Sequence, residues 1–435
     1  MSWFLRDGGG VSMRALRRLT VLAGVAIGLA AGAAPAAAGA DDETGHIPID
    51  HVVVLMQENR SFDSYFGQLH FEGQPHSAPE PRGARNPNPT SEDAPPIRAF
   101  HQTANCEVAD LNHSWTGTHQ ELDGNRMDGF TAANAVPADP TGSRAMGFYD
   151  SQDLPFYYAL YSQFAIGDRY FASVPGPTFP NREYLLAGTS FGHIMNDLPA
   201  AGLPGRSIFN LLDEAHVSWR IYFSDIPAGF LFEYVRLHAA GHVVPVSQYY
   251  LDAAAGRLPQ VAFVDPRFGG SNNVESDEHP PANIQVGEQF TASVIDALFK
   301  SPEWGSSALF LTYDEHGGYF DHVPPPAAMA PDDIAPRLQP GDTLATFDRY
   351  GVRVPAVVVS PFARPRFVSH QVHDHTSILR FIETRFGLPA LTRRDAAADP
   401  MLEFFNFAHA SFATPPTLPA APLDPAKAAQ CATLG

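Results

Sequence analysis

The feature that most constrains this chain is a set of apolar runs that each end in a polar or acidic cluster. The runs span residues 51–56, 261–264, 308–313 and 354–360. They are continuous rather than alternating, which is typical of strands buried on both faces in a mostly parallel sheet. Helical patterns lie at residues 207–216, 293–299 and 376–386. The sequence therefore predicts an α/β fold, with a ligand site beyond the carboxyl ends of the strands.

Length and charge narrow the possible functions. The chain has 435 residues, of which 44% are hydrophobic and 17% are charged, so it can form a large globular core. Its 28 basic and 47 acidic residues give a formal charge of -19. Nucleic-acid binding depends on Lys and Arg that neutralise phosphates, so this balance argues against a nucleic-acid partner. We infer no protein partner from the sequence.

The first forty residues have the pattern of a secretory signal. Three arginines between residues 14 and 18 precede an apolar stretch over residues 19–34, and small residues follow. A transmembrane anchor is the alternative, but this stretch is short and rich in Ala and Gly. We therefore expect residues 1–40 to be removed during export by a Sec or weak twin-arginine route, which would leave a secreted or periplasmic protein.

We expect one main domain over residues 41–412, followed by a Pro/Ala-rich tail over residues 413–435. A loop insertion is predicted at about residues 70–110, because its proline-rich part has no hydrophobic period. This insertion could be a lid, although a tolerated insertion is the simpler interpretation. Cys106 and Cys431 are the only cysteines. In an oxidising compartment they could form a disulfide that ties the tail to the body, or they could remain free.

Two polar clusters at predicted strand ends suggest a metal site. Glu58 and Asn59 follow the first run, and Asp314, Glu315 and His316 follow the third. Hard oxygen ligands of this kind suit a divalent cation, with calcium, magnesium or manganese favoured and zinc possible through His316. Either cluster alone could be a solvated loop or a helix cap.

A candidate nucleophile lies in the Gly/Pro-rich turn over residues 175–182. Thr178 precedes a predicted helix at residues 181–187, whose N-terminal N–H groups could hold a phosphate. Arg182 could contact a phosphate through two N–H groups, and Asn181 lies beside it. A metal-bound hydroxyl loses its proton readily, which would make Thr178 an alkoxide nucleophile. The alternative is a threonine that only caps the helix.

Histidines in polar loops could supply a proton to a leaving group. His113 and His119 lie in one such loop, and His279 lies in another. The segment His373–His375 could provide further metal ligands, but it also opens the helix predicted at residues 376–386, and capping is the simpler explanation.

Four motifs make the chain recognisable. They are Gln57–Gly67 (QENRSFDSYFG), Gly176–Arg182 (GPTFPNR), Glu278–Pro281 (EHPP) and Thr312–Pro326 (TYDEHGGYFDHVPPP). Together they closely resemble the bacterial phosphoesterase family, which includes phosphatidylcholine-hydrolysing phospholipases C and a branch of secreted acid phosphatases. The resemblance extends from about residue 48 to residue 390, so the main domain is expected to be a phosphoesterase domain.

The resemblance implies a fold and a set of site residues. The implied fold is an alkaline-phosphatase-like core with a central, mostly parallel sheet flanked by helices on both faces. The implied metal ligands are Glu58, Asn59, Thr178, Asp314 and Glu315. The implied catalytic residues are Thr178 as nucleophile, with His113 and His279 lining the phosphate pocket. Arg182, Asn181, His119 and His316 are the remaining candidates for substrate binding.

The expected function is that of an exported, metal-dependent phospholipase C with a threonine nucleophile. It would cleave a glycerophospholipid to diacylglycerol and a phosphorylated head group, with at most peripheral membrane contact. Thr178 and Glu315 favour this branch, because some acid phosphatases of the family have a serine and a second aspartate there. The alternatives are a broad-specificity acid phosphatase that acts on small phosphate monoesters, and a catalytically inactive anion-binding protein. Sulfatase activity is less favoured, because Thr178 replaces the formylglycine precursor.

Overall fold

The computed structural model describes residues 46–434, so the predicted signal at residues 1–40 lies outside the described part of the chain. Residues 47–434 form one compact unit, which includes the described part of the Pro/Ala-rich tail. The domain boundaries at residues 41 and 412 stay predictions. Within residues 46–434, no helix combines the length and the apolar character needed to span a bilayer.

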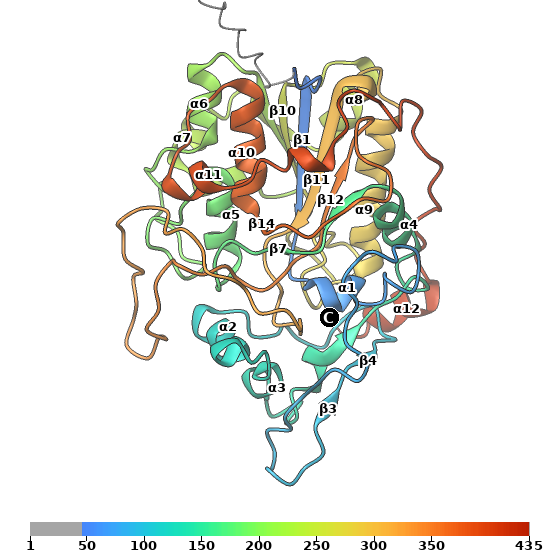
Figure 1. Cartoon of the computed structure of the whole chain (residues 1–435), viewed down its shortest axis with the longest axis vertical. Helices are drawn as coiled ribbons and strands as arrows, with labels where there is room; N and C mark the ends of the chain where they lie inside the picture. Colours follow the sequence, from blue (N-terminus) through green and yellow to red (C-terminus); the bar gives the residue numbers. More distant parts are fainter. Residues whose placement is uncertain (1–45, 435) are drawn as a thin grey trace, which may run out of the picture. The chain divides into compact units, whose positions relative to one another are not determined.

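A central sheet of eight strands organises this unit (Figure 1). Its order is β13 (Val368–Ser369), β6 (Ala165–Gly167), β12 (Ala356–Val359), β11 (Ser307–Tyr313), β1 (His51–Gln57), β10 (Val261–Asp265), β8 (Trp219–Phe223) and β9 (Val243–Pro245). All neighbouring pairs are parallel except those of β12, which runs antiparallel to both β11 and β6. The four predicted runs are strands of this sheet, and β1, β10, β11 and β12 are buried along almost their whole length.

Helices cover both faces of the sheet, as the α/β prediction requires (Figure 1). One group comprises α5 (Thr178–Ala187), α6 (Ile208–Glu214), α7 (Glu233–Leu237), α10 (His375–Phe386) and α11 (Arg393–Ala397). The other comprises α4 (Pro155–Gln163), α8 (Ser247–Ala255) and α9 (Ile284–Phe299). The buried residues of α9 recur every three or four positions, so one stripe of this helix packs on the core.

Capping explains where α10 begins and ends. Asp374 is the N-cap of the helix and forms a capping box with Ser377. Gly387 ends the helix with a φ of 65°. The capping interpretation of residues 373–375 is therefore confirmed.

A smaller region lies beyond the carboxyl ends of the central strands (Figure 1). It contains α1 (Phe62–Phe66), β2 (Arg85–Asn86), β3 (Ile97–Arg98), β4 (Phe100–His101), α2 (Trp115–Leu122), α3 (Phe130–Ala133) and β5 (Gly147–Phe148). The predicted insertion contributes the β2–β3 ladder, and it contributes β4 to the ladder with β5. A separate hydrophobic cluster, which includes Leu122, Phe130 and Phe320, holds this region together.

The remaining elements are short. They are the strand pair β7 (Tyr170–Phe171) and β14 (His373–Asp374), and 3-10 helices at Asp123–Asn125, Ser143–Met146, Ala228–Leu231, Trp304–Ser306 and Leu402–Phe404.

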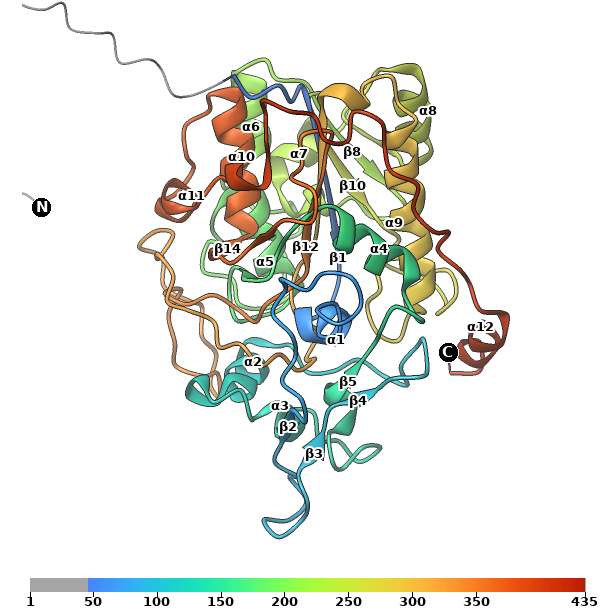
Figure 2. The ribbon, with the colours of Figure 1, turned by 45° about the vertical axis from the view of Figure 1, so that its right-hand side comes forward.

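The C-terminal tail is fastened to the body. It runs past α9 and ends in α12 (Pro425–Cys431) (Figure 2). Cys106 and Cys431 form a disulfide, with their Cα atoms 5.7 Å apart. Of the two possibilities left open for the cysteines, the structure therefore has the bonded pair.

Candidate active site

The two predicted acidic clusters lie side by side because their strands are neighbours. Gln57, the last residue of β1, pairs with Tyr313, the last residue of β11. Glu58 and Asn59 therefore leave the sheet next to Asp314 and Glu315. This is the carboxyl edge of the parallel strands, where ligand sites of open α/β sheets form.

Backbone hydrogen bonds hold the clusters together. Oδ1 of Asp314 accepts from the N–H of Asn59 at 3.2 Å and from the N–H of Glu315 at 2.7 Å. Asn59 has a φ of 59°, a left-handed conformation that Asn tolerates better than most residues. Gly317 packs against Asn59 so closely that a Cβ there would lie 2.5 Å from the Asn59 carbonyl oxygen. The loop after β11 therefore needs glycine at this position.

The cluster concentrates buried negative charge around one arginine. Arg182 places Nη2 3.0 Å from Oε1 of Glu58 and Nε 3.3 Å from Oδ2 of Asp314. Burial raises the pKa of Glu58, although Arg182 opposes the shift, and burial together with Glu58 raises the pKa of Asp314. For Glu315 burial also acts to raise the pKa, but His113 and His316 outweigh it and hold the pKa below its usual range.

Three buried oxygen atoms of this cluster have no hydrogen-bond partner among the described residues. They are Oδ1 of Asn59, Oδ2 of Asp314 and Oε1 of Glu315. Leaving buried polar atoms unpaired is costly, and all three are hard oxygen ligands of the kind that divalent cations prefer. The residues present therefore fit a divalent cation.

Thr178 is the first residue of α5 rather than its cap. The N-cap position is Pro177, and no side chain caps the helix. The helix begins three residues earlier than the sequence pattern predicted. The capping alternative for Thr178 is thus wrong, and its side chain lines a cavity instead.

Asn181, a predicted substrate-binding residue, has its side chain directed into the turn that precedes α5. Its Nδ2 donates to the carbonyl oxygens of Val174, Gly176 and Pro177, and its Oδ1 accepts from the N–H of Val174. The amide is therefore fully used in shaping the turn that presents Thr178, and Asn181 does not line the cavity.

The cavity that contains Thr178 has a volume of about 500 Å³ and is lined by both polar and apolar side chains. The polar lining residues are Glu58, Thr178, Arg182, Asn196, Arg236, Glu275 and His279. The apolar lining residues are Phe179, Leu198, Ile226, Pro227, Ala228, Phe230, Leu231 and Phe268. Ile226 is 58% exposed, so the apolar lining reaches the surface of the protein.

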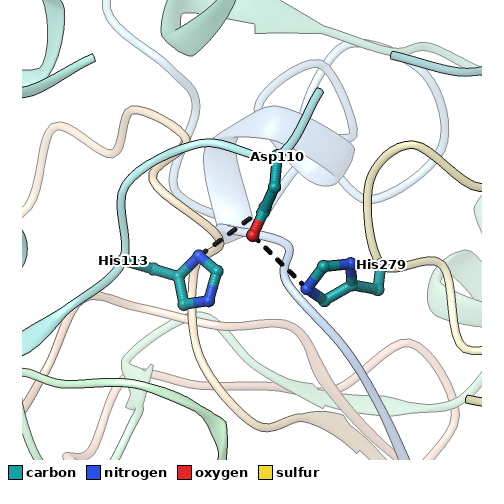
Figure 3. Close-up of side chains that lie close together, drawn as sticks. All are labelled: Asp110, His113 and His279. Carbon is teal, nitrogen blue, oxygen red and sulfur yellow. Dashed lines mark ion pairs between the residues drawn. The ribbon is translucent and has the colours of Figure 1, made fainter. Parts of the chain in front are cut away.

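His113 and His279 come together with a carboxylate between them (Figure 3). Their ring centroids are 5.9 Å apart and the rings are almost perpendicular. Asp110 lies 3.7 Å from Nδ1 of His113 and 3.5 Å from Nε2 of His279. Nε2 of His113 is 3.9 Å from Oε1 of Glu315, which joins the histidine pair to the acidic cluster. Burial lowers the pKa of His113, but Glu315 and Asp110 outweigh it, so the pKa is raised.

Sequence reasoning missed two carboxylates in this region. Asp110 could have been found from its position three residues before His113. Glu278, inside a recognised motif, is fully buried with a φ of 74°. Its carboxylate accepts from the Tyr157 hydroxyl at 2.5 Å, the Tyr313 hydroxyl at 3.0 Å and Nε2 of Gln57 at 3.1 Å. This anchor fixes the start of the loop that carries His279.

His316 and His119 do not line the cavity. The two ring nitrogens of His316 lie 2.6 Å from Glu121 and 3.4 Å from Glu315, so both face carboxylates. Burial lowers the pKa of His316, but these carboxylates raise it to about 9. His119 places Nδ1 2.7 Å from the carbonyl oxygen of Trp115, one turn back in α2.

Comparison with known proteins decides the family. The model of the phosphoesterase family matches residues 49–389. This chain belongs to the phosphoesterase family. As a phosphoesterase it is a hydrolase that acts on phosphoric ester bonds, which confirms the predicted reaction class.

Curated relatives of this phosphoesterase are named phospholipases C. Non-specific phospholipase C1 of Arabidopsis thaliana is 33% identical over 390 residues, which cover 82% of this chain and 71% of the relative. Phospholipase C B of Mycobacterium tuberculosis is 33% identical over 449 residues, which cover 89% and 83%. Among solved structures, a protein in the alkaline phosphatase superfamily from Vibrio parahaemolyticus has a TM-score of 0.41 and 10% identity, and the match covers 81% of this chain and 69% of that one.

Proposed function

We propose that this phosphoesterase is an exported, metal-dependent phospholipase C. The observation that carries the proposal is the lining of the cavity, which combines Thr178, Glu58 and Arg182 with eight apolar residues. A glycerophospholipid combines the same two kinds of group, because its phosphate and head group are polar and its acyl chains are not. The relatives named phospholipase C support the same substrate class.

The proposed metal ligands are Glu58, Asn59, Thr178, Asp314 and Glu315. When bound, a divalent cation would stabilise the alkoxide form of the Thr178 hydroxyl and polarise the phosphate. Arg182 lines the same cavity and holds Glu58 and Asp314 by ion pairs, so it would both orient two ligands and face the phosphate.

The proposed reaction has two steps. Oγ1 of Thr178 attacks phosphorus, the bond from phosphorus to the diacylglycerol oxygen breaks, and a histidine protonates the leaving alkoxide. Water then hydrolyses the phosphothreonine ester and releases the phosphorylated head group. His113 and His279 are the candidates for the proton transfers, because both lie at the acidic cluster or the cavity.

Charge favours a diester substrate over a monoester. A monoester presents two negative oxygens to the site, whereas a phosphatidylcholine is zwitterionic. The chain has a formal charge of -19, and several buried carboxylates surround Arg182, with Arg236 the other basic residue of the cavity lining. Such a field admits a zwitterion more readily than a dianion.

Export is part of the proposal. A structural disulfide such as Cys106–Cys431 persists in oxidising compartments, and the predicted signal at residues 1–40 would direct the chain there.

The deciding experiment compares p-nitrophenyl phosphorylcholine with p-nitrophenyl phosphate at neutral pH after incubation with calcium, magnesium or manganese. We expect the higher kcat/KM for the phosphorylcholine ester. The reverse order, with an acidic optimum, would assign the protein to acid phosphatases. Binding of a non-hydrolysable analogue, with no turnover of either ester, would instead support an anion-binding protein.

A second experiment tests whether the apolar lining of the cavity binds the acyl chains. Ile226→Asp should lower kcat/KM for a long-chain phosphatidylcholine and leave p-nitrophenyl phosphorylcholine almost unaffected. The matched control is Leu251→Asp, because Leu251 is 60% exposed on α8 and does not line the cavity. Equal losses on the long-chain substrate for both variants would argue against an acyl-chain site.

A further inference from the structure

Asp110 has a position that the four recognised motifs do not explain. Its two carboxylate oxygens face two histidines from loops that are distant in the sequence (Figure 3). Oδ1 is 3.7 Å from His113 Nδ1, and Oδ2 is 3.5 Å from His279 Nε2. One side chain therefore joins the only two histidines that the proposed reaction uses.

The carboxylate is held in place by its own backbone. Oδ1 of Asp110 accepts a hydrogen bond from the N–H of Leu111 at 2.8 Å, which fixes the side chain at the start of the turn. The carbonyl oxygen of Leu111 is in turn 2.9 Å from Nδ1 of His113. Because a carbonyl oxygen only accepts, Nδ1 carries the proton in this contact. The carbonyl of Leu111 thus fixes the tautomer of His113, while the carboxylate of Asp110 faces the same ring nitrogen at 3.7 Å.

This arrangement leaves Nε2 of His113 facing the acidic cluster. That nitrogen is 3.9 Å from Oε1 of Glu315, one of the buried oxygens without a hydrogen-bond partner. A histidine whose Nδ1 is held by an acceptor, and whose Nε2 points toward the proposed metal ligands, is oriented to transfer a proton at Nε2.

We propose that Asp110 is the positioning residue that holds His113 and His279 for proton transfer to the leaving group. This inference rests on the proposed phosphoesterase mechanism. In the step concerned, the Thr178 hydroxyl gives up its proton to solvent, the bond between its Oγ1 and phosphorus forms, and the bond from phosphorus to the leaving oxygen breaks. The proton moves from Nε2 of His113 to that oxygen. One oxygen of Asp110 faces the ring of His113 and the other keeps His279 beside the cavity, so a single carboxylate positions both rings.

The test uses two soluble substrates that differ only in the leaving group. The leaving p-nitrophenolate of p-nitrophenyl phosphorylcholine needs no proton, whereas the alkoxide of dibutyryl phosphatidylcholine does. With the metal-loaded enzyme, Asp110→Asn should lower kcat/KM for the alkyl ester by about 10- to 100-fold, the usual effect of losing a residue that orients a site ligand. It should change the p-nitrophenyl ester little. Asp110→Glu should restore part of the alkyl-ester activity.

Two further variants complete the test. Asp93→Asn removes the same charge from an exposed position and should change neither rate. In a double-mutant cycle, Asp110→Asn should add little to the alkyl-ester loss already caused by His113→Gln, because both remove the same proton transfer.

Equal losses on both substrates, or fully additive losses in the cycle, would show that Asp110 only stabilises the loop, and would overturn the inference. A wild-type enzyme that cleaves neither ester would instead contradict the proposed function, and the inference with it. The two failures are therefore distinguishable by the wild-type rates alone.

Discussion

Nη2 of Arg182 donates a hydrogen bond to Oε1 of Glu58 at 3.0 Å, and both side chains are buried where the cavity meets the acidic cluster. The same guanidinium lies 3.3 Å from Asp314. One cation thus balances two carboxylates that follow neighbouring strands. Its loss affects the proposed ligands whether or not a phosphate is present.

Arg182→Gln should therefore lower stability as well as activity. Removing one partner of a buried ion pair leaves the other charge uncompensated, which typically costs about 3–5 kcal/mol. We expect a loss of this size in urea denaturation of the metal-free protein. The control Arg206→Gln breaks an exposed pair with Glu214 and should cost about 1 kcal/mol or less. A comparable loss in the two variants would show that Glu58 and Asp314 do not depend on Arg182.

Asp314→Asn should have opposite effects with and without metal. Asp314 lies among Glu58 and Glu315, so in chelator its removal relieves repulsion between buried carboxylates, and the variant should be at least as stable as the wild type. With added divalent cation the wild type should gain stability and activity, and the variant should gain much less. Thermal unfolding with and without chelator, together with elemental analysis, measures both effects. Full activity of the wild type after exhaustive chelation would contradict metal dependence.

The strands that precede the acidic clusters could be predicted because the apolar sequence of each strand itself indicates that the strand is buried. The runs at residues 51–56 and 308–313 are apolar at almost every position that the sheet buries, with Thr312 the exception, and a polar residue follows each run. Two neighbouring parallel strands then bring Glu58 and Asp314 together. The antiparallel direction of β12 was not predictable in this way, because a buried strand has the same composition in either direction.

The parts of the site that depend on distant partners were not predictable. His316 follows an acidic pair, which suggested a ligand, but α2 places Glu121 2.6 Å from its ring. Asn181 lies beside Arg182, yet its amide is used by the preceding turn. In both cases the sequence correctly indicates a polar residue next to the site. The direction of its side chain depends on contacts with distant residues, which the local sequence does not encode.

Thr178→Ala should abolish turnover while preserving the fold. Thr178 makes no cap hydrogen bond and lines the cavity, so its removal takes away the proposed nucleophile without opening the core. We expect a loss of several orders of magnitude in kcat and an almost unchanged unfolding temperature. Thr178→Ser retains the hydroxyl and should keep partial activity. Turnover of the alanine variant at the wild-type rate would mean that water, rather than Thr178, attacks phosphorus.

Glu288 should make the stability depend on pH. Burial raises the pKa of Glu288 from 4.5 to about 8, so the folded protein keeps a proton that the unfolded chain releases near pH 4.5. This contribution to stability is complete below pH 4.5 and is lost as the pH rises toward 8. Glu288→Gln cannot ionise, and its Oε1 can still accept from the N–H of Tyr157, as Glu288 does at 3.0 Å.

The variant should therefore match the wild type near pH 4.5 and exceed it at pH 8, by an amount on the order of a few kcal/mol. Urea denaturation at both pH values measures this difference. The exposed Glu92→Gln serves as the control for loss of charge. A constant difference between Glu288→Gln and wild type across this range would show that Glu288 is already ionised in the folded protein.

The disulfide should hold the loop that carries His279 in place, in addition to raising the global stability of the protein. The carbonyl oxygen of Cys431 accepts from Nδ2 of Asn272 at 3.1 Å, and the N–H of Glu107, next to Cys106, donates to the carbonyl oxygen of Pro281 at 3.4 Å. The bonded segments thus hold both sides of the loop. Replacing both cysteines by serine should lower the free energy of unfolding by about 2–5 kcal/mol.

Hydrogen exchange separates the local effect from the global one. Amides of residues 272–285 should exchange faster in the double-serine variant under conditions where β1 remains protected, because the loop loses its anchor before the sheet opens. The kcat for an alkyl phosphoester should fall with that protection, since His279 lies on this loop. If exchange rises equally in the loop and in β1, the disulfide acts only through global stability and the position of His279 depends on Glu278 and its tyrosine partners alone.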